Sequence, residues 1–132
     1  MKLTPSLVPF RLSLGNRGEM VACAFLKEKG YEILEKNYKC KLGEIDVIAR
    51  RAGRLVFVEI KTRTSAQFGV PQEAVDLRKQ EKIFKLAQWY LKEKKLEKIS
   101  MAFDVVAVLW KEGQTPEMRL IADAFERRDK SY

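Results

Sequence analysis

Three charged side chains in two β-rich segments are the residues best suited to chemistry. Residues 43–48 carry Asp46, and residues 57–61 carry Glu59 and Lys61. β-Branched and aromatic residues surround all three, which predicts a pair of central strands. Two carboxylates inside buried strands must be offset by a cation or by protonation, because an unpaired buried charge is costly.

The loop between these strands decides whether the acids meet. It contains a glycine and no apolar run, so we predict a hairpin turn. A two-residue loop at Ala52 and Gly53 would place Asp46 directly opposite Glu59, and a four-residue loop would keep that pairing. Lys61 would then project beside both acids, because residues two apart share a face of a strand.

A hard divalent cation suits such an acid pair. Mg²⁺ is typically held by one or two carboxylates together with water and phosphate oxygens, and Mn²⁺ accepts the same oxygen ligands. Lys61 could neutralise part of the charge. The alternative is that Asp46, Glu59 and Lys61 lie at strand ends in solvent.

The composition narrows the chemistry further. There is no histidine among the 132 residues, which excludes Ser-His-Asp and Cys-His nucleophiles, histidine-ligated zinc and histidine acid–base catalysis. Hydrolysis would have to use carboxylates, lysine, tyrosine or a metal ion that lowers the pKa of its water. The net charge of +8 favours an anionic partner, with nucleic acid ahead of a membrane surface.

We expect one cytoplasmic domain over residues 15–125, with tails at 1–14 and 126–132. No apolar run approaches the roughly 18 residues that span a bilayer, and no export signal is evident, so membrane insertion and a disulfide are not expected. Cys23 falls in a helical pattern and is predicted to be a small core residue.

Hydrophobic periodicity predicts the element order α-β-β-β-α-β-β. A strand, a long helix and the next strand form a crossover, which should set those two strands parallel. The fold class is therefore α/β, with a mixed central sheet and helices on both faces. The expected helices cover residues 15–28 and 71–95. The first expected strand begins at residue 31, and four more cover residues 43–50, 54–62, 101–110 and 118–125.

The acid, the Glu-x-Lys strand, the preceding acidic helix and the basic long helix resemble the PD-(D/E)xK nuclease superfamily. That superfamily includes restriction endonucleases and archaeal Holliday-junction resolvases, and the resemblance implies a restriction-endonuclease-like αβββαβ core. A larger set of motifs over residues 15–125 resembles the YraN-like family of uncharacterised bacterial proteins. These motifs are Gly15-x-x-Gly18-Glu19, Gly43-Glu44-Ile45-Asp46, Phe57-Val58-Glu59-Ile60-Lys61-Thr62-Arg63, Gly69-Val70-Pro71, Lys79-Gln80, Phe103-Asp104-Val105-Val106 and Ala124-Phe125.

Two positions depart from that family's pattern. Ala102 stands where a basic residue usually precedes Phe-Asp, which would remove one phosphate contact. Ile45 stands where the family has a proline before the first acid, a position that varies across the superfamily. Neither departure touches the acid pair itself.

The resemblance implies a Mg²⁺- or Mn²⁺-dependent nuclease acting on DNA, with branched DNA as one substrate. Asp46 would be the central metal ligand and Glu59 the second, with the backbone carbonyl of Ile60 as a third. Lys61 would orient or deprotonate the attacking water and stabilise charge in the transition state. Glu19 would reach the metal through water or complete a second site; alternatively, it is an exposed helix acid.

Residues of the long helix and of the strand before it would contact nucleic acid. The residues proposed for this role are Arg63, Lys79, Gln80 and Lys82. A solvated helix face is the alternative reading for the helix residues. Asp104 would either pair with a basic residue such as Arg63 or belong to a polar network.

Several alternatives stay open at this point. The substrate could be RNA rather than DNA, and the protein could be a monomer or a homodimer. The chain could also be a non-catalytic nucleic-acid-binding accessory protein built on a nuclease fold.

Overall fold

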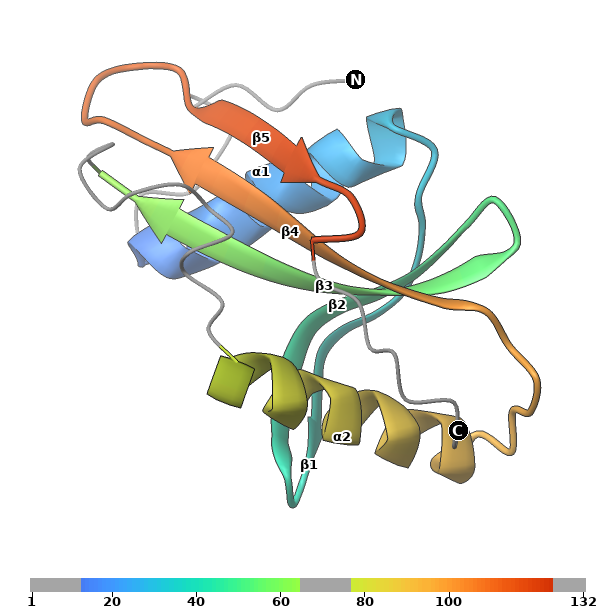
Figure 1. Cartoon of the computed structure of the whole chain (residues 1–132). Helices are drawn as coiled ribbons and strands as arrows, with labels where there is room; N and C mark the ends of the chain where they lie inside the picture. Colours follow the sequence, from blue (N-terminus) through green and yellow to red (C-terminus); the bar gives the residue numbers. More distant parts are fainter. Residues whose placement is uncertain (1–12, 65–76, 125–132) are drawn as a thin grey trace.

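The computed structural model describes residues 13–64 and 77–124, which form a five-stranded sheet with a helix against each face (Figure 1). The α/β class and mixed sheet predicted from sequence are confirmed, and the order fits a restriction-endonuclease-like αβββαβ core. The elements are α1 (Leu14–Glu28), β1 (Glu32–Cys40), β2 (Gly43–Arg51), β3 (Arg54–Arg63), α2 (Leu77–Glu93), β4 (Met101–Leu109) and β5 (Glu117–Ile121).

Some sequence predictions lie outside the described residues. They are the two tails, the loop that carries Gly69-Val70-Pro71, the start of the long helix at Pro71 and the final Phe125. None of the described helices is long and apolar enough to cross a membrane.

The strands lie in the sheet in sequence order, β1-β2-β3-β4-β5. The first three strands pair antiparallel, β3 and β4 pair parallel, and β5 returns antiparallel to β4. The crossover from β3 through α2 to β4 therefore gives parallel strands, as predicted. β1 begins one residue later than expected, and its polar residues suit a strand at the edge of the sheet.

The β2–β3 hairpin has a two-residue loop, one of the two loop lengths that keep the predicted register. Ala52 and Gly53 both adopt positive φ, 51° and 76°, and Arg51 pairs with Arg54 across the loop. Positive φ at both central positions is the geometry of the type I′ turn, whose twist matches that of the strands it joins. The loop parity fixes the register on which the site depends.

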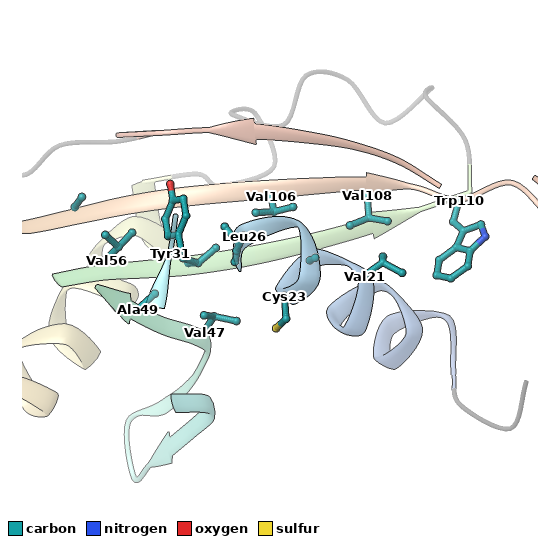
Figure 2. Close-up of a cluster of buried hydrophobic side chains, with 13 residues drawn as sticks. Val21, Cys23, Leu26, Tyr31, Val47, Ala49, Val56, Val106, Val108 and Trp110 are labelled. Carbon is teal, nitrogen blue, oxygen red and sulfur yellow. The ribbon is translucent and has the colours of Figure 1, made fainter. Parts of the chain in front are cut away.

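Helix α1 covers one face of the sheet through an apolar cluster (Figure 2). Ser13 begins the helix by accepting a hydrogen bond from the Asn16 amide at 3.1 Å. Buried helix residues such as Val21 and Leu26 then pack on the valines of the central strands. Cys23 is 4% exposed and unpaired in a disulfide, which confirms it as a small core residue.

Helix α2 covers the opposite face, where the aromatic side chains gather. Phe57 and Phe103 stack at 5.7 Å between ring centroids, and Tyr90 of α2 meets the edge of Phe57 at 6.0 Å. Ile83 and Leu86 complete the buried side of the helix. The two helices thus bury different faces of the same strands, which holds the middle of the sheet between two cores.

Asp104 is the one charged residue among the described residues that is fully buried, at 3% exposure. Tyr31 donates its hydroxyl hydrogen bond to Asp104, and the Asp123 amide donates at 2.9 Å. The expected alternative of an Arg63 partner is wrong, since Arg63 lies opposite Leu109 in the β3–β4 register, five residues along from Asp104. Asp104 belongs to a polar network that ties the start of β1 to the chain after β5.

Candidate active site

The site begins where β2 and β3 separate. The hairpin pairs from Arg51 with Arg54 as far as Val47 with Val58. Beyond that point β2 pairs only with β1 and β3 only with β4, and the two ribbons diverge (Figure 1). Asp46 and Glu59 are the next residues after the last pair, so both acids stand at the point of divergence.

Asp46 is held there by a backbone contact. Its Oδ2 accepts a hydrogen bond from the Ile60 amide at 2.8 Å. The contact involves the amide of Ile60; its carbonyl, which the family resemblance implies as a metal ligand, is a separate group, and that role stays a prediction. The half-buried carboxylate thus bridges the two strands where their ladder stops.

Glu59 lies among cations on the α2 side of β3. Its Oε1 is 3.2 Å from Lys61 Nζ and 2.6 Å from Lys79 Nζ. The Glu59 and Lys61 side chains are only 15% and 18% exposed. Lys79 reaches them from the first described turn of α2, so one of the predicted nucleic-acid-binding residues is part of the acid–lysine cluster.

The electrostatics of Asp46 are unusual for a carboxylate. Burial raises its pKa to about 7, and the charge of Glu59 adds to the increase. The Ile60 hydrogen bond acts in the opposite direction, while the charges of Glu19 and Glu44 add to the increase. A carboxyl that resists ionisation among three other acids is a site where a bound cation would be favoured.

The two lysines beside Glu59 are shifted in opposite directions. Burial and the nearby Lys79 ammonium lower the pKa of Lys61, although Glu59 partly opposes this. Burial also disfavours the charge on Lys79, but its contacts with Glu59 and Lys61 outweigh burial and raise its pKa. Because its pKa is lowered, Lys61 gives up its proton more readily than Lys79, so it is the lysine of the pair that can act as a neutral amine base.

A second group of acids lies on the α1 side of Asp46. A pocket of about 310 Å³ opens there, and its lining includes Glu19, Cys23, Lys36, Asn37 and Asp46. Burial raises the pKa of Glu19, and the charge of Glu44 adds to that effect. Glu19 is therefore half-buried beside Asp46, which is not the exposed helix acid of the alternative interpretation.

Asn37 is a site residue that the sequence reasoning missed. With its amide group turned to suit its neighbours, it donates to Glu19 at 3.2 Å and to Glu44 at 3.0 Å. Its φ of 51° interrupts β1 beside Asp46, between the pairs that Lys36 and Tyr38 make with β2. Asparagine tolerates this left-handed backbone better than most residues, and that preference is the one signal in the sequence.

The remaining predicted residues are Lys82, Gln80 and Arg63. Lys82 is exposed, and its Cε lies so close to Gly43 that an added Cβ there would be 2.9 Å away. Gln80 is half-buried in α2, and Arg63 is half-buried at the end of β3. The structure therefore gathers Asp46, Glu59 and two lysines.

The donor set fits a small oxygen-ligated cation. Within residues 13–64 and 77–124, no three side chains of the His, Cys, Asp and Glu types converge as a complete metal site. A Mg²⁺-type site needs only one or two carboxylates, with water and substrate oxygens supplying the rest. Asp46 and Glu59 could fill that role, provided that Lys79 yields part of its contact with Glu59.

Known relatives cover most of the chain. The model of the uncharacterised protein family UPF0102 matches residues 18–108. A UPF0102 protein of Caldanaerobacter subterraneus is 51% identical over 73% of this chain and 79% of its own length. Others from Geotalea daltonii and Syntrophus aciditrophicus are 48% and 49% identical, over 86% and 87% of this chain and 90% of each relative. The resemblance to the YraN-like family is thereby confirmed, and the chain belongs to the uncharacterised protein family UPF0102.

Proposed function

We propose that this protein is a divalent-metal-dependent nuclease that hydrolyses phosphodiester bonds in DNA, including branched or junction DNA. The observation that carries the proposal is the half-buried Asp46 carboxylate at the divergence of β2 and β3, with its pKa raised to about 7 beside Glu59. Buried acids that face one another lower the stability of a fold, which favours a functional role for them. The function that suits these carboxylate oxygens is the binding of a divalent cation.

The residues around Asp46 divide the work of hydrolysis. Asp46 and Glu59 would hold Mg²⁺ or Mn²⁺, which when bound supplies Lewis-acid stabilisation of charge on the phosphate. Lys61, whose pKa is lowered, would accept a proton from the attacking water or orient it. If Glu59 holds the cation, Lys79 would donate to a phosphate oxygen in place of its present contact with Glu59.

One observation favours a second candidate, a non-catalytic nucleic-acid-binding protein on the same fold. Glu59 already has two lysine partners at 3.2 and 2.6 Å, and these ion pairs neutralise its charge without any metal ion. In this case the lysine-rich cluster would bind phosphates directly. The net charge of +8 supports both candidates equally.

Cleavage assays separate the two candidates. A four-way junction, a nicked duplex and single-stranded DNA would be incubated with the protein in Mn²⁺ or in EDTA. The nuclease predicts cleavage in Mn²⁺ that is lost in EDTA and in Glu59→Ala, and kept in Glu112→Ala, which removes an exposed acid from a turn. Failure to cut any substrate, with DNA binding retained by Glu59→Ala, would leave the binding protein as the function.

Thermal unfolding tests the cation site without any substrate. A ligand that binds only the folded state raises its stability, by about 2.7 kcal/mol at a hundredfold excess over Kd. Mn²⁺ should therefore raise the Tm of the native protein at pH 8. Asp46→Asn and Glu59→Ala should abolish that rise, whereas Glu112→Ala should retain it; an equal rise in all four proteins would point to unspecific binding.

A further inference from the structure

A row of cations follows the outer side of α2. We define the basic stripe as Arg78, Lys82, Lys85, Trp89 and Lys92, five positions spaced by three or four residues. All four of its charged residues are exposed, and Trp89 is half-buried. At about 100° per residue these positions fall within an arc of about 80°, so they form one continuous strip.

The charged residues of the stripe lie on the side of α2 away from its buried residues, and Trp89 packs against the aromatic core. The buried residues of the helix, among them Ile83, Ala87 and Tyr90, occupy the opposite side and contact the sheet. Figure 1 shows α2 lying across the β1–β2 hairpin. The acids Glu81 and Glu93 lie at the two margins of the stripe rather than within it.

The β1–β2 hairpin adds a further cation to the stripe. Lys41 lies just after β1, and its Nζ sits 5.0 Å above the ring of Trp89. A lysine over an indole is stabilised by the ring electrons and stays hydrated on its outer side. The stripe thus has one aromatic side chain, at the fourth of its five positions, with a cation on each side along the helix and a third above it.

The stripe also leads to the candidate active site. Lys82 packs against Gly43 at the start of β2, three residues from Asp46. One residue after Arg78, Lys79 makes its 2.6 Å contact with Glu59. A polyanion lying on the stripe would therefore reach the acid cluster at one end of α2.

A membrane surface is a poorer partner than nucleic acid. A basic helix that binds lipid must insert its apolar face into the bilayer. The apolar face of α2 is already buried against the sheet, where Leu86 and Ala87 are at most 1% exposed. The stripe can offer only charge and one aromatic side chain, which are the groups that bind a phosphate backbone and an unpaired base.

We propose that the basic stripe binds the phosphate backbone of the nucleic acid and carries it toward the Asp46 site. This inference rests on the proposed function, whose nucleic-acid partner it places on one face. Arg78 and Lys92 are separated by 14 residues of helix, about 21 Å. That length matches about six successive phosphates of one strand at 3.4 Å per step along the duplex axis.

Salt-dependent DNA binding in EDTA tests the stripe separately from catalysis. The probe is a 20-base-pair duplex, and the double variant is Lys85→Gln with Lys92→Gln. The matched control is Lys27→Gln with Lys111→Gln, which removes two exposed charges away from α2. Each lost phosphate contact lowers the slope of log affinity against log salt by about 1, so the stripe variant should lose about 2 and the control almost nothing.

Tryptophan fluorescence provides a second readout. Trp89 and Trp110 are the two tryptophans of the chain, and Trp110 is buried at 5% exposure. Single-stranded DNA should quench the tryptophan fluorescence of the native protein, and Trp89→Phe should lose most of that quenching. Equal salt slopes for both double variants would overturn the proposal that the stripe binds DNA. Binding to phosphatidylserine vesicles but not to DNA would overturn it as well. If Glu59→Ala loses cleavage while its salt slope stays that of the native protein, the nuclease is supported independently of the stripe.

Discussion

The Asp46 carboxylate accepts a 2.8 Å hydrogen bond from the Ile60 amide at the point where β2 and β3 part. In a continuous hairpin that position would be bridged by the backbone of β2. The side chain of Asp46 therefore replaces a rung of the ladder, and the bond uses its Oδ2. This contact ties an acid with a raised pKa to the same strand that carries Glu59 and Lys61.

The first prediction concerns the pH dependence of stability in EDTA. The pKa of Asp46 in the folded protein, about 7, lies above its ordinary 3.8. Its contribution to stability is therefore complete below pH 4 and is lost as the pH rises through 7. Asp46→Asn keeps an oxygen for the Ile60 amide and cannot ionise, so its stability relative to the native protein should grow between pH 4 and 8, by up to about 4 kcal/mol.

Urea unfolding at several pH values measures that difference. Glu112→Gln serves as the control because its side chain is exposed in a turn. Its stability should follow the native curve throughout. A constant gap between Asp46→Asn and the native protein across this range would show that Asp46 ionises normally in the folded state.

The second prediction concerns the two lysines beside Glu59. Glu59→Gln removes the carboxylate that both lysines contact. The raised pKa of Lys79 should therefore fall, and the pKa of Lys61, which is already lowered, should fall below its value in the native protein. Two half-buried ammonium groups would then face each other, and we expect a loss of about 1–3 kcal/mol at pH 7. NMR titration of the labelled lysine Nζ atoms reports both values. Glu97→Gln, an exposed acid in the loop before β4, should leave them unchanged.

Loop parity is the reason that so much of the site could be predicted from sequence. A type I′ turn at Ala52 and Gly53 fixes which residues of β2 and β3 face each other. Alternation along β3 then sets Glu59 and Lys61 on one face, where their 3.2 Å ion pair is found. These relations are local, so the sequence pattern determines them.

The contacts missed by the sequence reasoning depend on distant parts of the chain. Lys79 reaches Glu59 because of how α2 crosses the sheet, and helix packing angles do not follow from a residue pattern. Asn37 meets Glu19 and Glu44 because its backbone is left-handed, which few sequence signals specify. Burial also favoured Tyr31, rather than Arg63, as the partner of Asp104.

The third prediction concerns that buried network. Tyr31→Phe would leave the Asp104 carboxylate in the core without its hydroxyl donor, and we expect a loss of about 1–3 kcal/mol. Tyr38→Phe is a matched control, because Tyr38 donates at 3.2 Å to Glu93, which is 47% exposed and can be hydrated instead. Urea unfolding should show the larger loss for Tyr31. Equal losses would show that Asp104 does not depend on its tyrosine.

The fourth prediction uses two glycines of α1. A Cβ added at Gly18 would lie 2.0 Å from Thr62 Oγ1, whereas one at Gly15 would meet nothing closer than 3.9 Å. Gly15→Ala should therefore stabilise the protein by up to about 1 kcal/mol, since alanine favours helix. Gly18→Ala should destabilise it by about 1–3 kcal/mol through overpacking.

Thr62→Ala supplies the rescue for that pair, because it removes Oγ1 and Cγ2, two of the three atoms that a new Cβ would strike. The double variant should regain part of the stability lost by Gly18→Ala alone. Similar stability of the two single glycine variants in urea would contradict a close approach of α1 to β3. That approach matters for the site, because Glu19 follows Gly18 directly and lines the pocket beside Asp46; a helix pushed outward at Gly18 should weaken any cation binding that needs Glu19.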